Sequence, residues 1–267
     1  MPELPEVEIF SRLVLEHCRG RGIDRVTVGD PGILDGISPE MLERRLEGER
    51  IRSSSRHGKH LFIILSGAGA LAMHFGTNGS LQLLSRLAAE PPYARLQLYL
   101  EGGDCLVYVN PRRLGRVGLC DGPEAFVARS GLGPDALDPA FDLRAFTAIL
   151  AASKRDVKTL LMDQKRIAGI GNIYSDEILF QARLYPGTLA AKLANGGASQ
   201  LFHAMRETLG AAIRCGAGSE QMTERLPKDF LLPHRHPGGV CPRCGGLLAT
   251  DKRGGRTGYY CPRCQSG

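Results

Sequence analysis

Three features that mark other classes of protein are missing from the sequence. No apolar run approaches the roughly 18 residues needed to span a bilayer. The first residues, MPELPE, are too acidic for a secretory signal peptide, and no internal repeat or long low-complexity tract is present. These absences argue against a membrane-spanning, a secreted or a repeat protein. We expect a protein of the cytoplasm, free or associated with the nucleoid.

The chain has little net charge, but that charge is unevenly distributed. Its 267 residues, 43% of them hydrophobic, can form one large or two modest domains, each with its own core. The net charge is +6, yet residues 136–267 carry 18 basic and 11 acidic side chains, a net charge of +7. Such an excess indicates a polyanionic partner such as nucleic acid, although an ordinary soluble surface gives the same count.

The eight cysteines fall into two groups. Four are scattered among apolar neighbours, and we interpret them as small buried residues in a reducing compartment: Cys18, Cys105, Cys120 and Cys215. The others form two C-x2-C pairs with sixteen residues between them, the spacing of a tetrahedral zinc site: Cys241, Cys244, Cys261 and Cys264. Residues 236–267 contain few large apolar side chains, so this segment needs a metal ion to fold. Two disulfides are the alternative.

The residues between the cysteine pairs predict a basic hairpin. Gly254 and Gly255 provide a turn, and Lys252, Arg253 and Arg256 flank it. A zinc-stabilised hairpin that presents cations is typical of a nucleic-acid clamp.

The remaining sequence divides into a strand-rich and a helix-rich half. Pro5 in a first turn and Gly20 beyond the last predict a helix near the N-terminus. Period-two runs then predict a β-sandwich or barrel from strands at 60–65, 70–74, 81–84, 95–100 and 105–109. After a Pro/Gly-rich joint at 121–140, helical patterns cover 141–151, 157–163, 175–182 and 199–215.

A glycine-rich turn at Gly169–Tyr174 lies between two predicted helices. Without a preceding strand it is weak evidence for dinucleotide binding. Its backbone N–H groups at a helix start could bind a phosphate, with Asn172 as a further donor and Lys154 and Lys158 nearby. The alternative is a tight interhelical turn beside a solvated basic face.

Several motifs occur together and in order along the whole chain. They are MPELPEVE at 1–8, GK at 58–59, NPRRLG at 110–115, MDQK at 162–165, GIGNIY at 169–174 and RTGYYCPRCQ at 256–265. In this combination the chain resembles the Fpg/Nei family, specifically the bacterial formamidopyrimidine-DNA glycosylases.

The resemblance implies an α+β multidomain fold. It places a catalytic β-sandwich with an N-terminal helix at 1–120, the joint at 121–140, a helix-two-turns-helix DNA-binding domain at 141–235 and a four-cysteine zinc-ribbon finger at 236–267. It also implies a monomer that binds damaged double-stranded DNA, one structural Zn²⁺, no organic cofactor and no membrane association.

The resemblance implies catalytic roles for residues at the N-terminus and for two cations farther along the chain. After removal of Met1, Pro2 would attack the sugar C1′ and leave a covalent imine; an α-amine with a pKa near 8 is a better nucleophile at neutral pH than a lysine near 10.4. Glu3 would protonate the ring oxygen as a general acid. By resemblance, Lys59 and Arg256 contact the departing phosphates and Asn172 holds the DNA backbone. In a purely structural interpretation, Pro2 and Glu3 only cap a helix and Lys59 is a strand-end charge.

The residues that would contact the flipped-out base depart from the family pattern. Family members fill the space left by the base with Met, Arg and Phe. Here Arg112 is retained, Thr77 replaces the methionine and Leu114 the phenylalanine, while Tyr93 occupies the position of a DNA-contacting histidine. The stretch Gly216–Val240, which carries the loop closing over oxidised guanine, is shortened. We expect these changes to affect lesion choice more than catalysis.

We therefore predict a bifunctional DNA glycosylase and abasic-site lyase of base excision repair. It would excise formamidopyrimidines and other oxidised bases by β,δ-elimination. Two alternatives remain: a family member with a changed lesion range, such as oxidised pyrimidines, hydantoins or abasic sites, or a protein that binds damaged DNA without cutting it.

Overall fold

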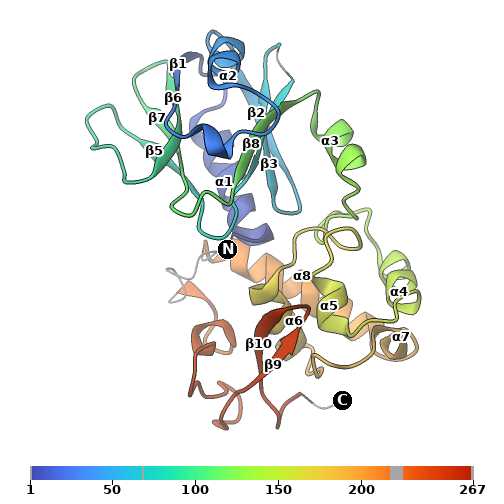
Figure 1. Ribbon diagram of the computed structural model, residues 1–267. Helices are drawn as coiled ribbons and strands as arrows, with labels where there is room; N and C mark the ends of the chain where they lie inside the picture. The colour runs from blue at the N-terminus through green and yellow to red at the C-terminus, as the bar shows by residue number, and fades with distance from the viewer. Residues whose placement is uncertain (1, 68, 217–224, 266–267) are drawn as a thin grey trace. The chain divides into compact units, whose positions relative to one another are not determined.

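The computed structural model describes residues 2–67, 69–216 and 225–265. The chain forms two compact units, coloured from blue to green and from green to red in Figure 1. The first consists of Glu6–Gly131 together with Pro2, and the second of Leu132 onward together with Glu3–Pro5. Each unit is described by itself.

The first unit is built on two four-stranded antiparallel sheets. One sheet has the order β1-β6-β7-β5, with β1 (Ile23–Val28), β6 (Ala94–Leu100), β7 (Cys105–Val109) and β5 (Ser80–Leu84). The other has the order β2-β3-β4-β8, with β2 (Ile51–His57), β3 (His60–Leu65), β4 (Ala70–His74) and β8 (Arg116–Cys120). The sandwich-or-barrel expectation thus resolves into a sandwich.

Alternation along the strands divides the second sheet between two apolar clusters. Leu61, Ile63 and Met73 join the main core of the unit, which also contains residues of the other sheet. Phe62 and Ala72 belong to a smaller cluster on the opposite face. This outer face is partly covered by Phe126 of α3 (Pro123–Ser130).

Helix α3 lies inside the Pro/Gly-rich joint at 121–140, where no helix was predicted. Pro123 stands in the first turn, where its missing N–H is harmless, and Gly131 ends the helix in a left-handed conformation with φ 62°. The same residue types that indicated a joint therefore mark the two ends of a helix. The unit also contains α1 (Leu4–His17), η1 (Pro31–Ile33) and α2 (Pro39–Leu46).

The second unit is helical up to the cysteine-rich segment. Asp142 and Asp156 cap α4 (Leu143–Ala151) and α5 (Val157–Leu161) through their side chains. The core collects around α6 (Asn172–Gln181) and α8 (Ala198–Arg214), and α7 (Ala190–Leu193) contributes to it. The remaining described elements are η3 (Leu232–His234) and the antiparallel pair β9 (Ala249–Arg253) and β10 (Arg256–Tyr260).

The predicted basic hairpin is therefore present. Gly254 and Gly255 form its turn with φ of 52° and 73°, a conformation that glycine adopts readily. Within the described ranges, no helix is long and apolar enough to cross a membrane.

Two buried histidines predict a loss of stability in mild acid. Burial, reinforced by neighbouring His74, His57 and Lys59, lowers the pKa of His60 to about 3. Burial, with Lys59 and Arg116, lowers the pKa of His74 to about 4. Below a pH of about 6.5 these two histidines take up protons in the unfolded chain but stay neutral in the folded chain. The free energy of unfolding therefore decreases as the pH falls from about 6.5 to the folded-state pKa values. We expect the free energy of unfolding, measured by urea denaturation between pH 7.5 and pH 5, to depend less on pH in the His60→Phe variant than in wild type.

His17→Asn is the matched control, because His17 is exposed. It should retain the wild-type pH dependence. Equal pH dependence in wild type and His60→Phe would contradict the assignment.

Candidate active site

The N-terminus of α6 is occupied by the side chain of Glu3. Gly171 N and Tyr174 N donate to Glu3 Oε2 at 2.6 and 3.2 Å, and Ile173 N donates to Oε1 at 2.9 Å. These amides are among those that a helix leaves without internal partners, and the helix dipole favours a negative charge there. In one of the two interpretations of the glycine-rich turn, such amides would bind a phosphate. A buried carboxylate of the chain itself occupies them instead.

The residues on either side of Glu3 have different surroundings. Leu4 is fully buried in the helical core, and its N–H donates to Gly169 O at 3.0 Å. A Cβ at Gly169 would lie 2.6 Å from the Leu4 side chain, so only glycine allows this approach. Pro2, by contrast, is only half-buried. The N-terminal segment is thus fixed from Glu3 onward, and Pro2 is the first described residue before that anchor.

Lys59 lies in the two-residue turn between β2 and β3. His57 and His60 pair across this turn, and Gly58 has a φ of 57°. The Lys59 residue is only 7% exposed. Arg56 links the turn to α1, because it donates to Gly58 O at 3.2 Å and to Glu8 Oε2 at 3.1 Å. The first unit therefore ties the Lys59 turn to the helix that follows Pro2.

The loops of Thr77 and of Arg112–Leu114 lie against each other. A Cβ at Gly76 would be 2.5 Å from the Leu114 carbonyl carbon, so the two backbones are in direct contact. Arg112 and Leu114 are exposed, whereas Thr77 is half-buried and its Oγ1 has no hydrogen-bond partner. The structure thus brings these three predicted DNA-contacting residues into one region.

Asp30, which was not singled out from the sequence, links the loop of Arg112–Leu114 to strand β6. Asp30 Oδ2 forms ion pairs with Arg113 Nε at 2.9 Å and with Arg95 at 3.3 Å. Arg113 has a left-handed backbone with φ 55°, and Tyr93 has φ 66° and an exposed ring that lies 5.6 Å from the Arg95 guanidinium. An Asp before a Pro-Gly turn looked only like a turn residue, and no local pattern connects it to arginines so far along the chain.

In the second unit, Asn172 and the hairpin of Arg256 are brought together. Asn172 Nδ2 donates to Thr257 O at 2.9 Å. An amide nitrogen carries two hydrogens, so this bond uses one of them. Arg256 and Lys154 are exposed.

Lys158 is a correction to the predicted set of DNA-contacting residues. Its side chain is 0% exposed, and its Nζ lies 2.5 Å from Asp176 Oδ1. Asp176 Oδ2 also accepts from Arg235 Nη2 at 2.8 Å and from Tyr259 N at 2.9 Å. Lys158 therefore neutralises a buried carboxylate and cannot reach a phosphate, because a buried charge needs its partner.

The same ion pair explains why β10 contains Gly258. A Cβ at this position would lie 1.8 Å from Lys158 Nζ and 2.6 Å from Asp176 Oδ1. Asp176, Arg235 and Gly258 were not singled out from the sequence. The signal available was a lone Asp-Glu pair in an otherwise apolar helix, at 176–177.

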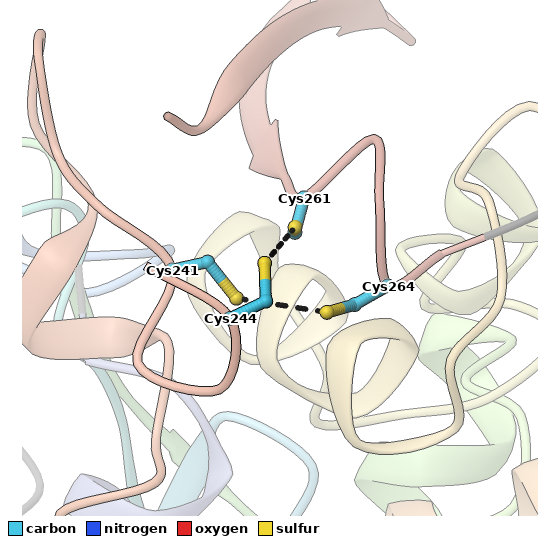
Figure 2. A group of neighbouring side chains, drawn as sticks. All are labelled: Cys241, Cys244, Cys261 and Cys264. Atoms are coloured by element: carbon cyan, nitrogen blue, oxygen red, sulfur yellow. Dashed lines mark hydrogen bonds between the residues drawn. The ribbon is translucent and has the colours of Figure 1, made fainter. Parts of the chain in front are cut away.

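The four cysteines of the two C-x2-C pairs converge, as Figure 2 shows. Their sulfur atoms all lie within 4.8 Å of one another, with 3.8 Å between Cys241 and Cys264 and 3.6 Å between Cys244 and Cys261. Zinc–thiolate bonds of about 2.3 Å in a tetrahedron place the sulfur atoms roughly 3.8 Å apart. The cluster thus fits one structural Zn²⁺. Of the other cysteines, three are buried and Cys215 is half-buried, and none of the eight is in a disulfide.

Comparison with known proteins identifies the family. Residues 1–117 match the formamidopyrimidine-DNA glycosylase N-terminal domain, residues 132–224 the H2TH domain of the same glycosylase, and residues 238–267 a zinc finger found in FPG and IleRS. The chain belongs to the formamidopyrimidine-DNA glycosylase family. A relative named formamidopyrimidine-DNA glycosylase from Moorella thermoacetica is 38% identical, with 93% of each chain covered. One of the same name from Carboxydothermus hydrogenoformans is 35% identical, covering 99% of this chain and all of the other.

Solved structures of the family have the same fold. The Lactococcus lactis Fpg in complex with DNA containing an abasic site matches with a TM-score of 0.89 and 28% identity, covering 99% of this chain and all of the other. The same protein with DNA containing N7-benzyl-Fapy-dG matches with a TM-score of 0.88 over the full length of both chains. The stretch Gly216–Val240 was expected to carry the loop that closes over oxidised guanine, and its residues 217–224 lie outside the described residues.

The buried position of Lys158 predicts a specific pattern in DNA binding. Lys158→Met should lower the free energy of unfolding by about 3 kcal/mol, because it leaves part of a buried ion pair unmatched. It should leave the slope of log affinity against log salt unchanged. Arg256→Met should reduce that slope by about one, as loss of one phosphate contact does. Fluorescence anisotropy with an abasic-site duplex measures both. If Lys158→Met reduced the slope of log affinity against log salt as much as Arg256→Met does, Lys158 would be a DNA-contacting residue after all.

The cysteine cluster predicts that the metal holds the terminal hairpin. Removal of zinc with a chelator should abolish amide protection in β9 and β10 and weaken DNA binding strongly, while β3 and β4 stay protected. Cys244→Ser should behave like the metal-free protein, and Cys215→Ser, which lies outside the cluster, like wild type. Hydrogen exchange read by mass spectrometry checks this. Unchanged DNA affinity of the metal-free protein would contradict it.

Proposed function

We propose that this chain is a bifunctional DNA glycosylase and abasic-site lyase that excises ring-opened and oxidised bases from duplex DNA. The observation that carries the proposal is the fixed carboxyl group of Glu3, directly after Pro2 in a chain of this family. In this proposal the protein acts as a monomer on genomic DNA in the bacterial cytoplasm. Its leading substrates are formamidopyrimidines, the lesions named in its relatives.

The reaction begins at the N-terminus once Met1 is removed. The secondary amine of Pro2 attacks the sugar C1′, and the C1′–N bond to the damaged base breaks. The base leaves with the bonding electron pair and takes a proton from water. The Glu3 carboxylate accepts the proton that the Pro2 nitrogen loses and donates it to the ring oxygen as a general acid, so that the sugar opens and an imine forms between Pro2 and C1′. Three backbone amides fix the Glu3 carboxyl group, so its position beside the amine is set before substrate binds.

The imine then drives strand cleavage. It acidifies the C2′ hydrogen, so loss of that proton expels the 3′ phosphate, and a second elimination expels the 5′ phosphate. We assign the contacts with these phosphates to Lys59 and Arg256, and a further backbone contact to the second amide hydrogen of Asn172. Lys154 extends this set along the exposed basic surface. Thr77, Arg112, Leu114 and Tyr93 would contact the space left by the base and the opposite strand.

Thr77, Arg112 and Leu114 are the wedge residues, which would fill the space left by the flipped-out base. Their chemistry affects which lesions the protein excises. Thr77 is half-buried and its buried hydroxyl group has no hydrogen-bond partner, while Leu114 is an aliphatic residue that is 53% exposed. Neither stacks on a base as an aromatic ring does, and stacking is worth about 1–3 kcal/mol per base. We therefore infer weaker discrimination among opposite bases, and a broader lesion range that includes oxidised pyrimidines, hydantoins and abasic sites.

Trapping with borohydride tests the mechanism. Zinc-loaded protein verified to begin at Pro2 should form a covalent adduct with an abasic-site duplex, and peptide mapping should locate it on Pro2. Pro2→Leu, which lacks the secondary amine and disfavours removal of Met1, should lose the adduct. Lys59→Met should retain it, because the nucleophile is not a lysine.

The outcomes separate the proposed functions. An adduct on Lys59, or cleavage by Glu3→Gln at the wild-type rate, would refute this mechanism. DNA binding without any adduct would support the alternative that the protein binds damaged DNA without cutting it. A panel of duplexes with different lesions then defines the substrate range.

A further inference from the structure

A cavity of about 540 Å³ lies in the first unit, on the outer face of the sheet β2-β3-β4-β8. Two small residues, Ala72 and Gly118, are paired directly across β4 and β8 and leave room at its floor. Helix α3 provides the opposite wall through Phe126 and Arg129. Pockets of this size commonly bind small molecules. None of its lining residues takes part in the chemistry proposed above.

One cross-strand row provides the polar side of the cavity. His60 pairs with His74, and His74 pairs with Arg116, so the three side chains stand in register on the same face. The rings of His60 and His74 are 5.1 Å apart, and the His60 ring is also 5.1 Å from that of Phe126. His60 Nδ1 is buried and has no hydrogen-bond partner. The wall therefore combines aromatic rings with a polar atom that lacks its bond.

The charges that line the cavity favour an anion. Both histidines are neutral at pH 7, so the cations are Arg116 and Arg129, and Asp35 is the carboxylate among the lining residues. Arg129 lies with its guanidinium 5.9 Å from the Phe126 ring, beside the surface on which a planar group would stack. Guanidinium groups bind phosphate through paired N–H donors. Aromatic walls and guanidinium groups together suit a ligand with a planar ring and a phosphate.

We propose that this cavity binds a nucleoside monophosphate, with the base against His60 and Phe126 and the phosphate against Arg116 and Arg129.

The cavity is connected to both loops that carry the predicted wedge residues. His74 Nδ1 accepts from Gly76 N at 3.3 Å, next to Thr77. Arg116 donates to Gly115 O at 2.7 Å and to Arg113 O at 3.4 Å, on either side of Leu114. A phosphate that engages Arg116 competes with those carbonyl groups. Occupation of the cavity should therefore loosen the loop that presents Arg112 and Leu114; the consequence for base excision rests on the proposed function, whereas the binding does not.

Calorimetric titration of the zinc-loaded full chain tests the site. Deoxyguanosine monophosphate should bind, and deoxyguanosine and deoxyribose 5-phosphate should each bind at least tenfold more weakly, since each lacks one of the two recognised groups. Saturation with an abasic-site duplex should leave the binding intact, which distinguishes this cavity from the DNA interface.

Two variants and a control locate the binding. Ala72→Leu fills the cavity, and Arg129→Glu reverses an exposed charge on α3 without disturbing a packed side chain; each should weaken binding tenfold or more. Arg52→Glu, an exposed charge reversal on β2, should have no effect. No binding by wild type, or equal binding by wild type and both cavity variants, would overturn the proposal.

Hydrogen exchange measures the connection to the loops. The nucleotide should speed exchange of the amides at 113–116 in wild type but not in Arg129→Glu. Binding without any such change would overturn the coupling. Borohydride trapping by Arg129→Glu at the wild-type level would show that the proposed lyase chemistry is independent of the cavity.

Discussion

The carboxylate of Glu3 at the N-terminus of α6 is the interaction on which the candidate site depends. A helix start buried in a protein must find acceptors for its free amides, and here a single side chain satisfies three of them. The same bonds fix the residue that follows the proposed nucleophile. One contact thus satisfies the start of the helix and also fixes the carboxyl group that we propose for catalysis.

Helix α6 extends this constraint to the metal-binding segment. Asn172 in its first turn contacts the backbone of β10, and Asp176 one turn later binds Lys158, Arg235 and the backbone of Tyr259. Glu177 accepts the amides of Leu231 and Leu232, while burial raises its pKa to about 7. Burying so many charges adds little net stability, because desolvation offsets the attraction. What it provides is a unique register of the hairpin against the helix, enforced by Gly258.

The sequence was informative where a pattern is local. Period-two runs located five strands within a residue or so, and the C-x2-C spacing located the metal site. It failed where partners are distant. Asp30 and its arginines lie more than 60 residues apart along the chain, and Lys158 looked like a surface cation because its partner Asp176 lies on another helix. The glycine-rich turn was correctly placed at a helix start, but the anion that occupies it comes from residue 3, a contact that no local rule encodes.

The distance along the chain between Glu3 and its partners has a consequence for biosynthesis. The segment Glu3–Pro5 leaves the ribosome some 170 residues before the amides that hold it. Until then the buried leucine and the carboxylate of this segment have no native partners, and closing so long a loop is slow. This segment is therefore made early but is among the last parts of the chain to reach its final place.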